Sequence, residues 1–427
     1  MPSFYLKVFS AVLTVLIALV GTFNFVVDPF DLFPSVKIKG FNAEKTELSK
    51  HLRLIKAHKV RFYQPGAIIL GTSRAEYGLD PQHPAWDSSA QPVYNLALSN
   101  GRIEESLQYL RHAHAHGKLK QVVLGADFFM FGEQFRVNTD YFTSRLSKKG
   151  QQGIDTGWLM DIINSLFTLD AIFASIDTVQ SQGLGKAMLY QADGMRRSDQ
   201  TWEQVRAKGG HNAVFLADIH HDLLFPAGLA TFSLSESNDK PSPTLDVFSE
   251  LVRFCLEQEI ELKVIISPMH AYKLEVLYHL GLWELFEYWK LRLTTIVENE
   301  NQRMPTAETV EIWDFSVYNS LTTEPVPSKE NPGFRMKWYW EGSHYRREFG
   351  DKILDCVLGD NLSDGCSLGQ QLSFFNIVEH LAGIREAGNI YRGSHLDDIK
   401  VLKTLVEDTR EERDALRRRV GWQSPQL

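Results

Sequence analysis

Apolar positions along the chain form one long run near the N-terminus and then settle into two alternating spacings. Residues 8–27 are almost continuously apolar, and about 20 such residues can cross a bilayer as one helix. Farther on, short apolar runs typical of buried strands alternate with the three-to-four-residue spacing of amphipathic helices. We expect strands at Ala67–Leu70, 93–98, 121–125, 262–267 and 310–315. We expect helices at 42–61, 102–116, 245–258, 271–300 and 345–358.

This order of strands and helices predicts an α/β domain with a largely parallel sheet covered on both faces, a three-layer α/β/α architecture. We assign residues 1–28 to a membrane anchor, 42–131 and 244–360 to the α/β domain, and 361–427 to a C-terminal helical tail. Between the two halves of the domain, 132–243 is a helical insertion, with a helical pattern around 158–179. The insertion either lines a site or simply protects the sheet.

The tail ends in a mixed-charge segment, 396–420, whose leucines have helical spacing. It predicts an exposed amphipathic helix that packs on the domain or on a second copy, so the oligomeric state stays open.

The apolar run predicts a single-pass membrane protein. A cleaved signal peptide has a shorter apolar region and a small-residue cleavage site, and no convincing site precedes Asp28, so we expect an uncleaved anchor. Lys7 and the N-terminal amine are the early positive charges, which favours a cytoplasmic N-terminus and an extracytoplasmic main domain. In a Gram-negative bacterium that compartment is the periplasm.

Charge and cysteine content exclude several classes of function. The formal net charge of -8 argues against a general nucleic-acid partner, which needs clustered basic residues. Cys255, Cys356 and Cys366 lack metal-ligand spacing, so we expect no zinc site and at most one disulfide. No nucleotide-binding glycine pattern is present, and we expect neither a metal nor another cofactor.

Polar residues follow the carboxyl ends of the expected strands, the edge at which open α/β sheets bind ligands. Ser73 follows the first strand, after Gly71, which permits a sharp turn. The remaining strand-end candidates are Ser99, Asn100, Gly101, Asp127, Ser267, His270 and Asp314, and Glu341 and His344 come from a loop before the last helix of the domain.

A serine needs a base to take its proton, and the base needs an acceptor that fixes its tautomer. Ser73, His344 and Glu341 can fill these three catalytic roles, with the backbone N–H groups of Ser73 and Gly101 as oxyanion donors and Asn100 as a further donor. The alternatives are that Ser73 caps a helix and that Glu341 pairs with Arg346 or Arg347.

Two further residues are candidates for substrate binding. His270 could bind substrate, replace His344 as base, or be structural. Arg74 could hold an anionic group or form a salt bridge with Glu76 or Asp80.

The combination resembles the SGNH (GDSL-like) hydrolase superfamily over about residues 64–358, apart from the insertion. Gly71-Thr72-Ser73 resembles the Gly-Asp-Ser block, Gly101 the glycine of the second block, and Glu341-Gly342-Ser343-His344 the Asp-x-x-His block. The third block departs from the family, because Asp127 stands at or beside the place of the usual oxyanion asparagine. A carboxylate repels an oxyanion unless it is protonated or turned away.

The resemblance is to the membrane-anchored, extracytoplasmic branch that includes polysaccharide O-acetyltransferase-like and lipoteichoic acid D-alanylation-type proteins. It implies a flavodoxin-like fold and an esterase or O-acyltransferase acting on a polysaccharide or acyl donor, with a membrane acyltransferase as a possible partner. The alternative is a catalytically silent relative that binds glycan or joins a membrane assembly, in which aromatic residues such as those at 338–340 stack on sugars or pack the core.

Overall fold

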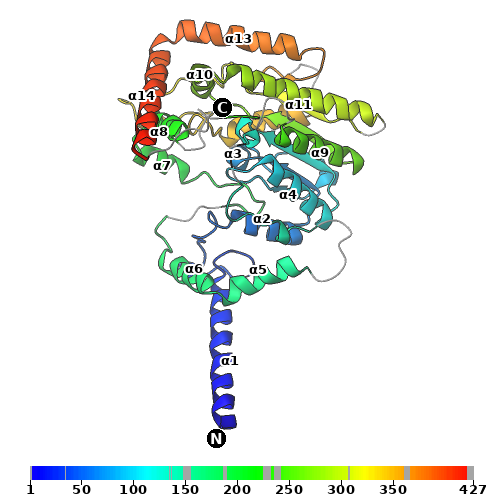
Figure 1. Ribbon diagram of the computed structural model, residues 1–427, viewed down its shortest axis with the longest axis vertical. Coiled ribbons are helices and arrows are strands. Elements are labelled where there is room, and N and C mark those ends of the chain that lie inside the picture. Colours follow the sequence, from blue (N-terminus) through cyan, green and yellow to red (C-terminus); the bar gives the residue numbers. More distant parts are fainter. Residues whose placement is uncertain are drawn as a thin grey trace. The chain divides into compact units, whose positions relative to one another are not determined.

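The computed structural model of the chain forms two compact units (Figure 1). The first comprises Met1–Pro65, Gln108–Lys118 and Asn138–Arg197, and the second comprises Gly66–Leu107, Leu119–Val137 and Ser198–Leu427. The described residues are 2–33, 35–133, 135, 137–147, 155–185, 190–224, 232–234, 242–305, 308–359 and 366–420.

The first unit contains the long apolar helix α1 (Pro2–Val27), which is long and apolar enough to cross a membrane. The helix expected at 42–61 is shorter: α2 covers Leu52–Tyr63. Asn42 is buried and its side chain hydrogen-bonds the backbone of Val26, Val36 and Ile38, so this stretch forms a turn that closes the end of α1 instead of a helix.

The helical pattern around 158–179 is a bent pair, α5 (Thr156–Phe167) and α6 (Leu169–Gln180), with an angle of 59° between them. The bend falls at Thr168, whose hydroxyl accepts a hydrogen bond from Ala171 N–H and caps α6. Two short 3-10 turns, η2 (Phe128–Phe131) and η3 (Thr143–Arg145), precede the pair along the chain.

The described part of the second unit holds a six-stranded, mostly parallel sheet of order β2-β1-β3-β4-β5-β6. Its strands are β1 (Ala67–Leu70), β2 (Val93–Asn95), β3 (Gln121–Ala126), β4 (Glu261–Ile266), β5 (Glu311–Asp314) and β6 (Gln370–Gln371). The first five strands are parallel and have the flavodoxin-like order, whereas β6 is antiparallel to β5 and was not expected. β1 is completely buried, as its unbroken apolar sequence predicts.

Helices connect and surround these strands. They are α3 (Ser73–Gly78), η1 (Ser88–Ala90), α4 (Ile103–His116), α7 (Thr201–Ala207), α8 (Gly210–Leu224), α9 (Pro243–Glu257), α10 (Ala271–His279), α11 (Trp283–Arg303), α12 (Arg347–Leu358), α13 (Ile377–Ser394) and α14 (Leu396–Val420). The single helix expected at 271–300 is two helices, because Gly281 adopts a left-handed φ of +75° after α10. The pair α9 and α11 packs together, as does the pair α3 and α12.

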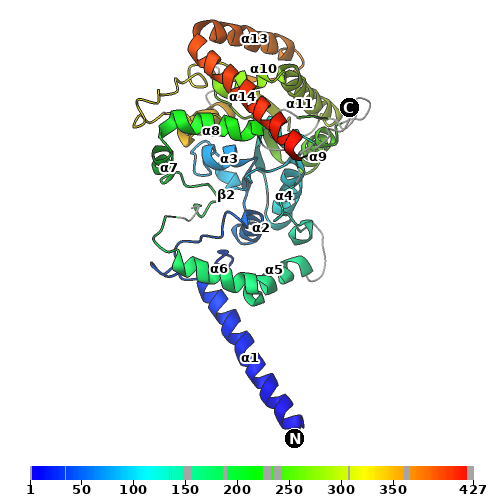
Figure 2. The ribbon, with the colours of Figure 1, turned by 60° about the vertical axis from the view of Figure 1, so that its left-hand side comes forward.

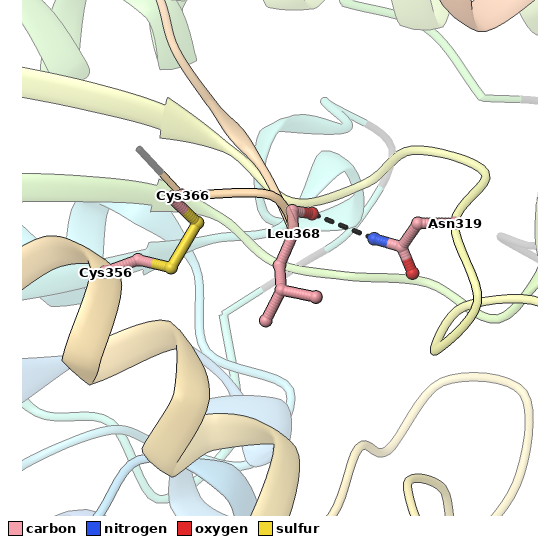
Figure 3. The surroundings of a disulfide bond; sticks show 4 residues. All are labelled: Asn319, Cys356, Cys366 and Leu368. Atoms are coloured by element: carbon pink, nitrogen blue, oxygen red, sulfur yellow. Dashed lines mark hydrogen bonds between the residues drawn. A yellow bond between two sulfur atoms is a disulfide. The ribbon is translucent and has the colours of Figure 1, made fainter. Parts of the chain in front are cut away.

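The tail packs on the second unit rather than standing free. α14 contacts α8 and α10, and its Leu402 and Val406 are buried. A disulfide between Cys356 and Cys366 links the end of α12 to the segment that leads into β6, next to Leu368, whose carbonyl accepts a hydrogen bond from the Asn319 side chain (Figure 3). The sequence predicts at most one disulfide, and the structure contains this one. Cys255 is a free, buried cysteine.

Candidate active site

The candidate nucleophile lies at the turn between β1 and α3. Gly71 has a φ of +140°, and a Cβ on it would lie 2.8 Å from the carbonyl oxygen of Gly125, so glycine is required where β1 passes β3. Thr72, and not Ser73, is the N-cap residue of α3, and its hydroxyl accepts from Arg74 N–H at 3.3 Å. The Ser73 hydroxyl is therefore not used as a cap.

His344 lies against this serine. Its Nε2 is 2.7 Å from Ser73 Oγ, although 271 positions separate the two residues in the chain. Its Nδ1 is hydrogen-bonded to Glu341 Oε1. With the Ser73 hydroxyl donating to Nε2, Nδ1–H donates to the carboxylate, which is the order of a serine nucleophile, its base and the orienting acid.

The Glu341 carboxylate is held by its own loop as well as by the imidazole. Oε1 accepts from His344 N–H at 2.9 Å and Oε2 accepts from Ser343 N–H at 2.7 Å. Burial would raise the pKa of Glu341, but the charge and hydrogen bond of His344, the hydrogen bond from Asp218 and the charge of Lys273 together outweigh it, so the pKa is lowered. The alternative salt bridges of Glu341 are absent from the ion pairs of the described residues, in which Arg346 pairs with Glu348 and Arg347 with Asp80 and Asp351.

A second carboxyl group lies behind the first. Asp218 of α8 hydrogen-bonds Glu341, and its Oδ2 accepts from Lys273 Nζ at 2.9 Å. Burial, together with the negative charge of Glu341, raises the pKa of Asp218 to about 7. Lys273 is completely buried and also pairs with Asp222 at 2.6 Å. Asp218 in its protonated form therefore donates to Glu341 and keeps that group ionised toward His344.

Helix α8 supports the same loop at another point. His211, near its start, bonds the Trp340 carbonyl through Nδ1 at 3.0 Å and accepts from Met336 N–H at Nε2 at 3.1 Å. Burial lowers the pKa of His211 to about 4, so the ring stays neutral and can fill both roles. The helical insertion thus supplies two side chains that position the loop of the candidate base.

Strand β2 fixes the helix that carries Ser73. The amide of Asn95, which is completely buried, donates to the carbonyls of Ala75 and Leu79 at 2.9 and 3.0 Å. Gly78 allows α3 to approach the base loop, since a Cβ there would lie 1.9 Å from Cε2 of Tyr345. Tyr345 directly follows His344, so this close approach sets where the base stands.

Asp127, which follows β3 beside β1, is buried and neutralised. Its carboxylate accepts from the Thr72 hydroxyl and lies 3.1 Å from Arg74 Nη1. The salt bridge of Arg74 is therefore with Asp127 and not with Glu76 or Asp80. Because Arg74 balances the charge of Asp127, that carboxylate does not face the nucleophile as an uncompensated anion.

The predicted oxyanion donors are only partly available. Gly101 N–H donates to the Leu98 carbonyl at 2.7 Å, so it is occupied in this conformation. Asn100 is exposed and has a left-handed φ of 52°, a conformation that asparagine tolerates better than most residues. Ser73 N–H is the remaining backbone donor of the predicted pair.

Other strand-end residues are engaged in the framework. His270 caps α10, with Nδ1 accepting from Tyr272 N–H and Nε2 donating to the Glu324 carbonyl, so both ring nitrogens are engaged and the arrangement matches the structural alternative. Asp314 pairs with Lys290 at 2.6 Å and with His380 at 2.9 Å. In the aromatic run, Tyr339 and Trp340 are buried and pack the core.

The described residues contain no cluster of three or more His, Cys, Asp or Glu side chains that could hold a metal ion.

Four residues that support the site are not among those expected from the sequence: Asn95, His211, Asp218 and Lys273. The one signal in the sequence for Asp218 is its place in the insertion 132–243, for which lining a site was one of the two expectations.

No protein-family model, curated protein or solved structure matches this chain.

Proposed function

We propose that the chain is a membrane-anchored, extracytoplasmic member of the SGNH superfamily, an esterase or O-acyltransferase that acts on cell-surface or exported polysaccharide. The observation that carries the proposal is the 2.7 Å contact between His344 Nε2 and Ser73 Oγ, with Glu341 on the other ring nitrogen. A pairing of groups so far apart in the chain is not demanded by local folding. The flavodoxin-like strand order, with Ser73 and Asp127 after neighbouring strands β1 and β3, supports the same family.

The chemistry follows from these positions. Ser73 Oγ attacks the carbonyl carbon of an ester while its proton passes to His344 Nε2. The imidazolium, stabilised by Glu341, then returns this proton to the departing alkoxide as the carbon–oxygen bond breaks, which leaves an acyl group on Ser73. In the second half, His344 takes a proton from water or from a sugar hydroxyl, whose oxygen attacks the acyl carbon. The bond between this carbon and Ser73 Oγ then breaks as His344 returns the proton to Oγ, which regenerates the serine. Water gives hydrolysis, and a sugar gives acyl transfer.

The extracytoplasmic location is supported by two features. Lys7 lies near the start of α1, before its continuous apolar stretch, and the positive-inside tendency keeps that end in the cytoplasm. The Cys356–Cys366 disulfide is typical of oxidising compartments and rare in the cytosol. A domain held there beside the membrane could take acyl groups from a membrane acyltransferase partner.

A catalytically silent SGNH-like glycan-binding or assembly protein is the second candidate. It is favoured by the occupied N–H of Gly101 and by Asp127, a carboxylate that cannot replace the amide donor of asparagine. In that case a Ser73→Ala, His344→Ala double variant retains the biological activity of the wild type.

Labelling with a fluorophosphonate probe tests the enzyme proposal. The wild type should be labelled, while Ser73→Ala and His344→Ala should lose labelling because one lacks the nucleophile and the other its base. Ser99→Ala is the matched control, since this serine follows the neighbouring strand and bonds Glu76 rather than an imidazole. Equal labelling of the wild type and Ser73→Ala would rule out the assigned nucleophile.

A further inference from the structure

The bent pair α5 and α6 has its large apolar side chains on the outside. Seven of them are at least 39% exposed: Leu159, Met160, Ile163 and Phe167 of α5, and Leu169, Phe173 and Ile176 of α6. Their spacing of three and four residues places them in one stripe along each helix.

The opposite face of the pair carries small and hydroxyl-bearing residues. The buried members are Ser165, Ala171, Ala174, Ser175 and Thr178. A helix on the surface of a water-soluble domain shows the reverse pattern, with large apolar residues inside and polar residues outside. The acidic residues do not interrupt the stripe, because Asp161 turns to Arg145 and His58, while Asp170 and Asp177 lie along one flank of α6.

The pair is joined to α1 within the same unit. Asn24 donates to the Leu166 carbonyl at 2.8 Å and accepts from the Ser175 hydroxyl at 2.8 Å. A Cβ on Gly21 would lie 2.5 Å from the ring of Phe167, so the glycine lets α5 sit directly on α1. In both views the two helices lie across the C-terminal end of α1 and not along it (Figures 1 and 2).

The level of this junction matches a membrane boundary. Counted from Lys7, the charged residue before the apolar run, helix α1 reaches Gly21 and Asn24 after 14 and 17 residues. At about 1.5 Å per residue this is about 21–26 Å, a few Å short of the far edge of a hydrocarbon core about 30 Å thick, which is the depth at which interfacial helices lie. Side chains of α1 before this point are exposed on all sides, as in a helix surrounded by lipid. The outer edge of a bilayer crossed by α1 therefore lies close to the level of α5 and α6.

We propose that α5 and α6 form a second, in-plane membrane contact that lies at the lipid–water interface with the stripe from Leu159 to Ile176 facing the acyl chains. The occupant of this face is the bilayer that α1 crosses, because the stripe continues the exposed apolar surface of α1 at its end. The contact fixes the orientation of the first unit in the bilayer, and it does not depend on the chemistry of Ser73.

Depth-dependent quenching tests this contact in the full chain. Ile163→Cys and Phe173→Cys are labelled with an environment-sensitive fluorophore and reconstituted in phosphatidylethanolamine–phosphatidylglycerol vesicles. Val378→Cys on α13 is the matched control, since it is also an exposed apolar helix position, 73% accessible. The native cysteines give little background, because Cys255 is buried and Cys356 is bonded to Cys366.

The expected result is a blue-shifted emission at 163 and 173 and a loss of intensity that is greater with nitroxide lipids labelled near the headgroup than with those labelled near the chain end. The control at 378 should show neither change. Stronger quenching from the chain end would mean a membrane-spanning or re-entrant pair and would overturn the proposal. A blue shift without quenching by the lipids would mean that protein covers the stripe. Emission like that of the control would mean that the stripe is exposed to water. Either result would overturn the proposal.

Discussion

Replacing Asp218 by asparagine should remove a pH dependence from the stability of the chain. Burial beside Glu341 raises the pKa of Asp218 from 3.8 to about 7. The folded chain therefore holds this proton more tightly than the unfolded chain does. The contribution is fully present below about pH 4 and is lost as the pH rises to about 7, because unfolding releases a proton throughout that interval.

The size of the effect follows from the shift. Each pKa unit corresponds to about 1.4 kcal/mol, so about three units give on the order of 4 kcal/mol between the ends of the interval. Asparagine keeps a neutral donor toward Glu341 and does not titrate. Glu341 itself has a lowered pKa, so its own contribution is lost only as the pH falls below its usual value of 4.5, outside most of this window.

The assay is the free energy of unfolding from urea denaturation of the full chain in detergent at several pH values from about 5 to 7. The wild type should lose stability relative to Asp218→Asn as the pH rises. Asp222→Asn is the matched control, because it removes a carboxylate that binds the same Lys273 but is the smallest of the charges that raise the pKa of Asp218, so it should keep most of the wild-type slope. If the free energy of unfolding changes with pH in the same way for the wild type and Asp218→Asn, Asp218 does not hold the proton that it is assigned to donate to Glu341.

Two further substitutions test packing and covalent linkage in the second unit. Gly78→Ala would place a Cβ 1.9 Å from the Tyr345 ring. The Tyr345 ring or α3 must then move, which should lower the free energy of unfolding by about 1–3 kcal/mol. The movement should displace His344 and slow fluorophosphonate labelling by about 10²-fold. Labelling at the wild-type rate would show that α3 does not set the position of His344. Cys356→Ser should lower the unfolding free energy by about 3 kcal/mol, the loop-entropy value for a separation of 10 residues, which an unchanged urea midpoint would contradict.

The sheet and the place of Ser73 directly after β1 could be predicted because their signals are local. A fully buried parallel strand is a continuous apolar run, and β1 was placed at its observed bounds for that reason. Most of the other differences between the expected and observed elements lie at element ends or at interruptions, such as the one at Gly281 that separates α10 from α11. Strand β6 carries no apolar pattern, since it consists of two exposed glutamines paired to β5.

The partners of the buried charges could not be predicted in the same way. Arg74 has two acidic neighbours within one or two turns, yet its partner is Asp127, 53 positions away. Asp218 reaches Ser343 and Glu341 across about 125 positions, and nothing in the sequence around it marks a link to the base loop. Such pairings are decided by the tertiary packing that buries the groups and not by their sequence neighbours.

If Ser73, His344 and Glu341 are catalytic, Ser73 forms a covalent acyl intermediate. The most direct test is to incubate the full chain with an activated acetyl ester, quench it in acid and locate the acetyl group by peptide mass spectrometry. We predict acetylation on the peptide that contains Ser73 in the wild type, none in Ser73→Ala, and greatly reduced acetylation in His344→Ala. Two results would show that Ser73 is not the nucleophile: no acetyl group on Ser73 in the wild type, or an equal amount of acetyl on another residue in the Ser73→Ala variant.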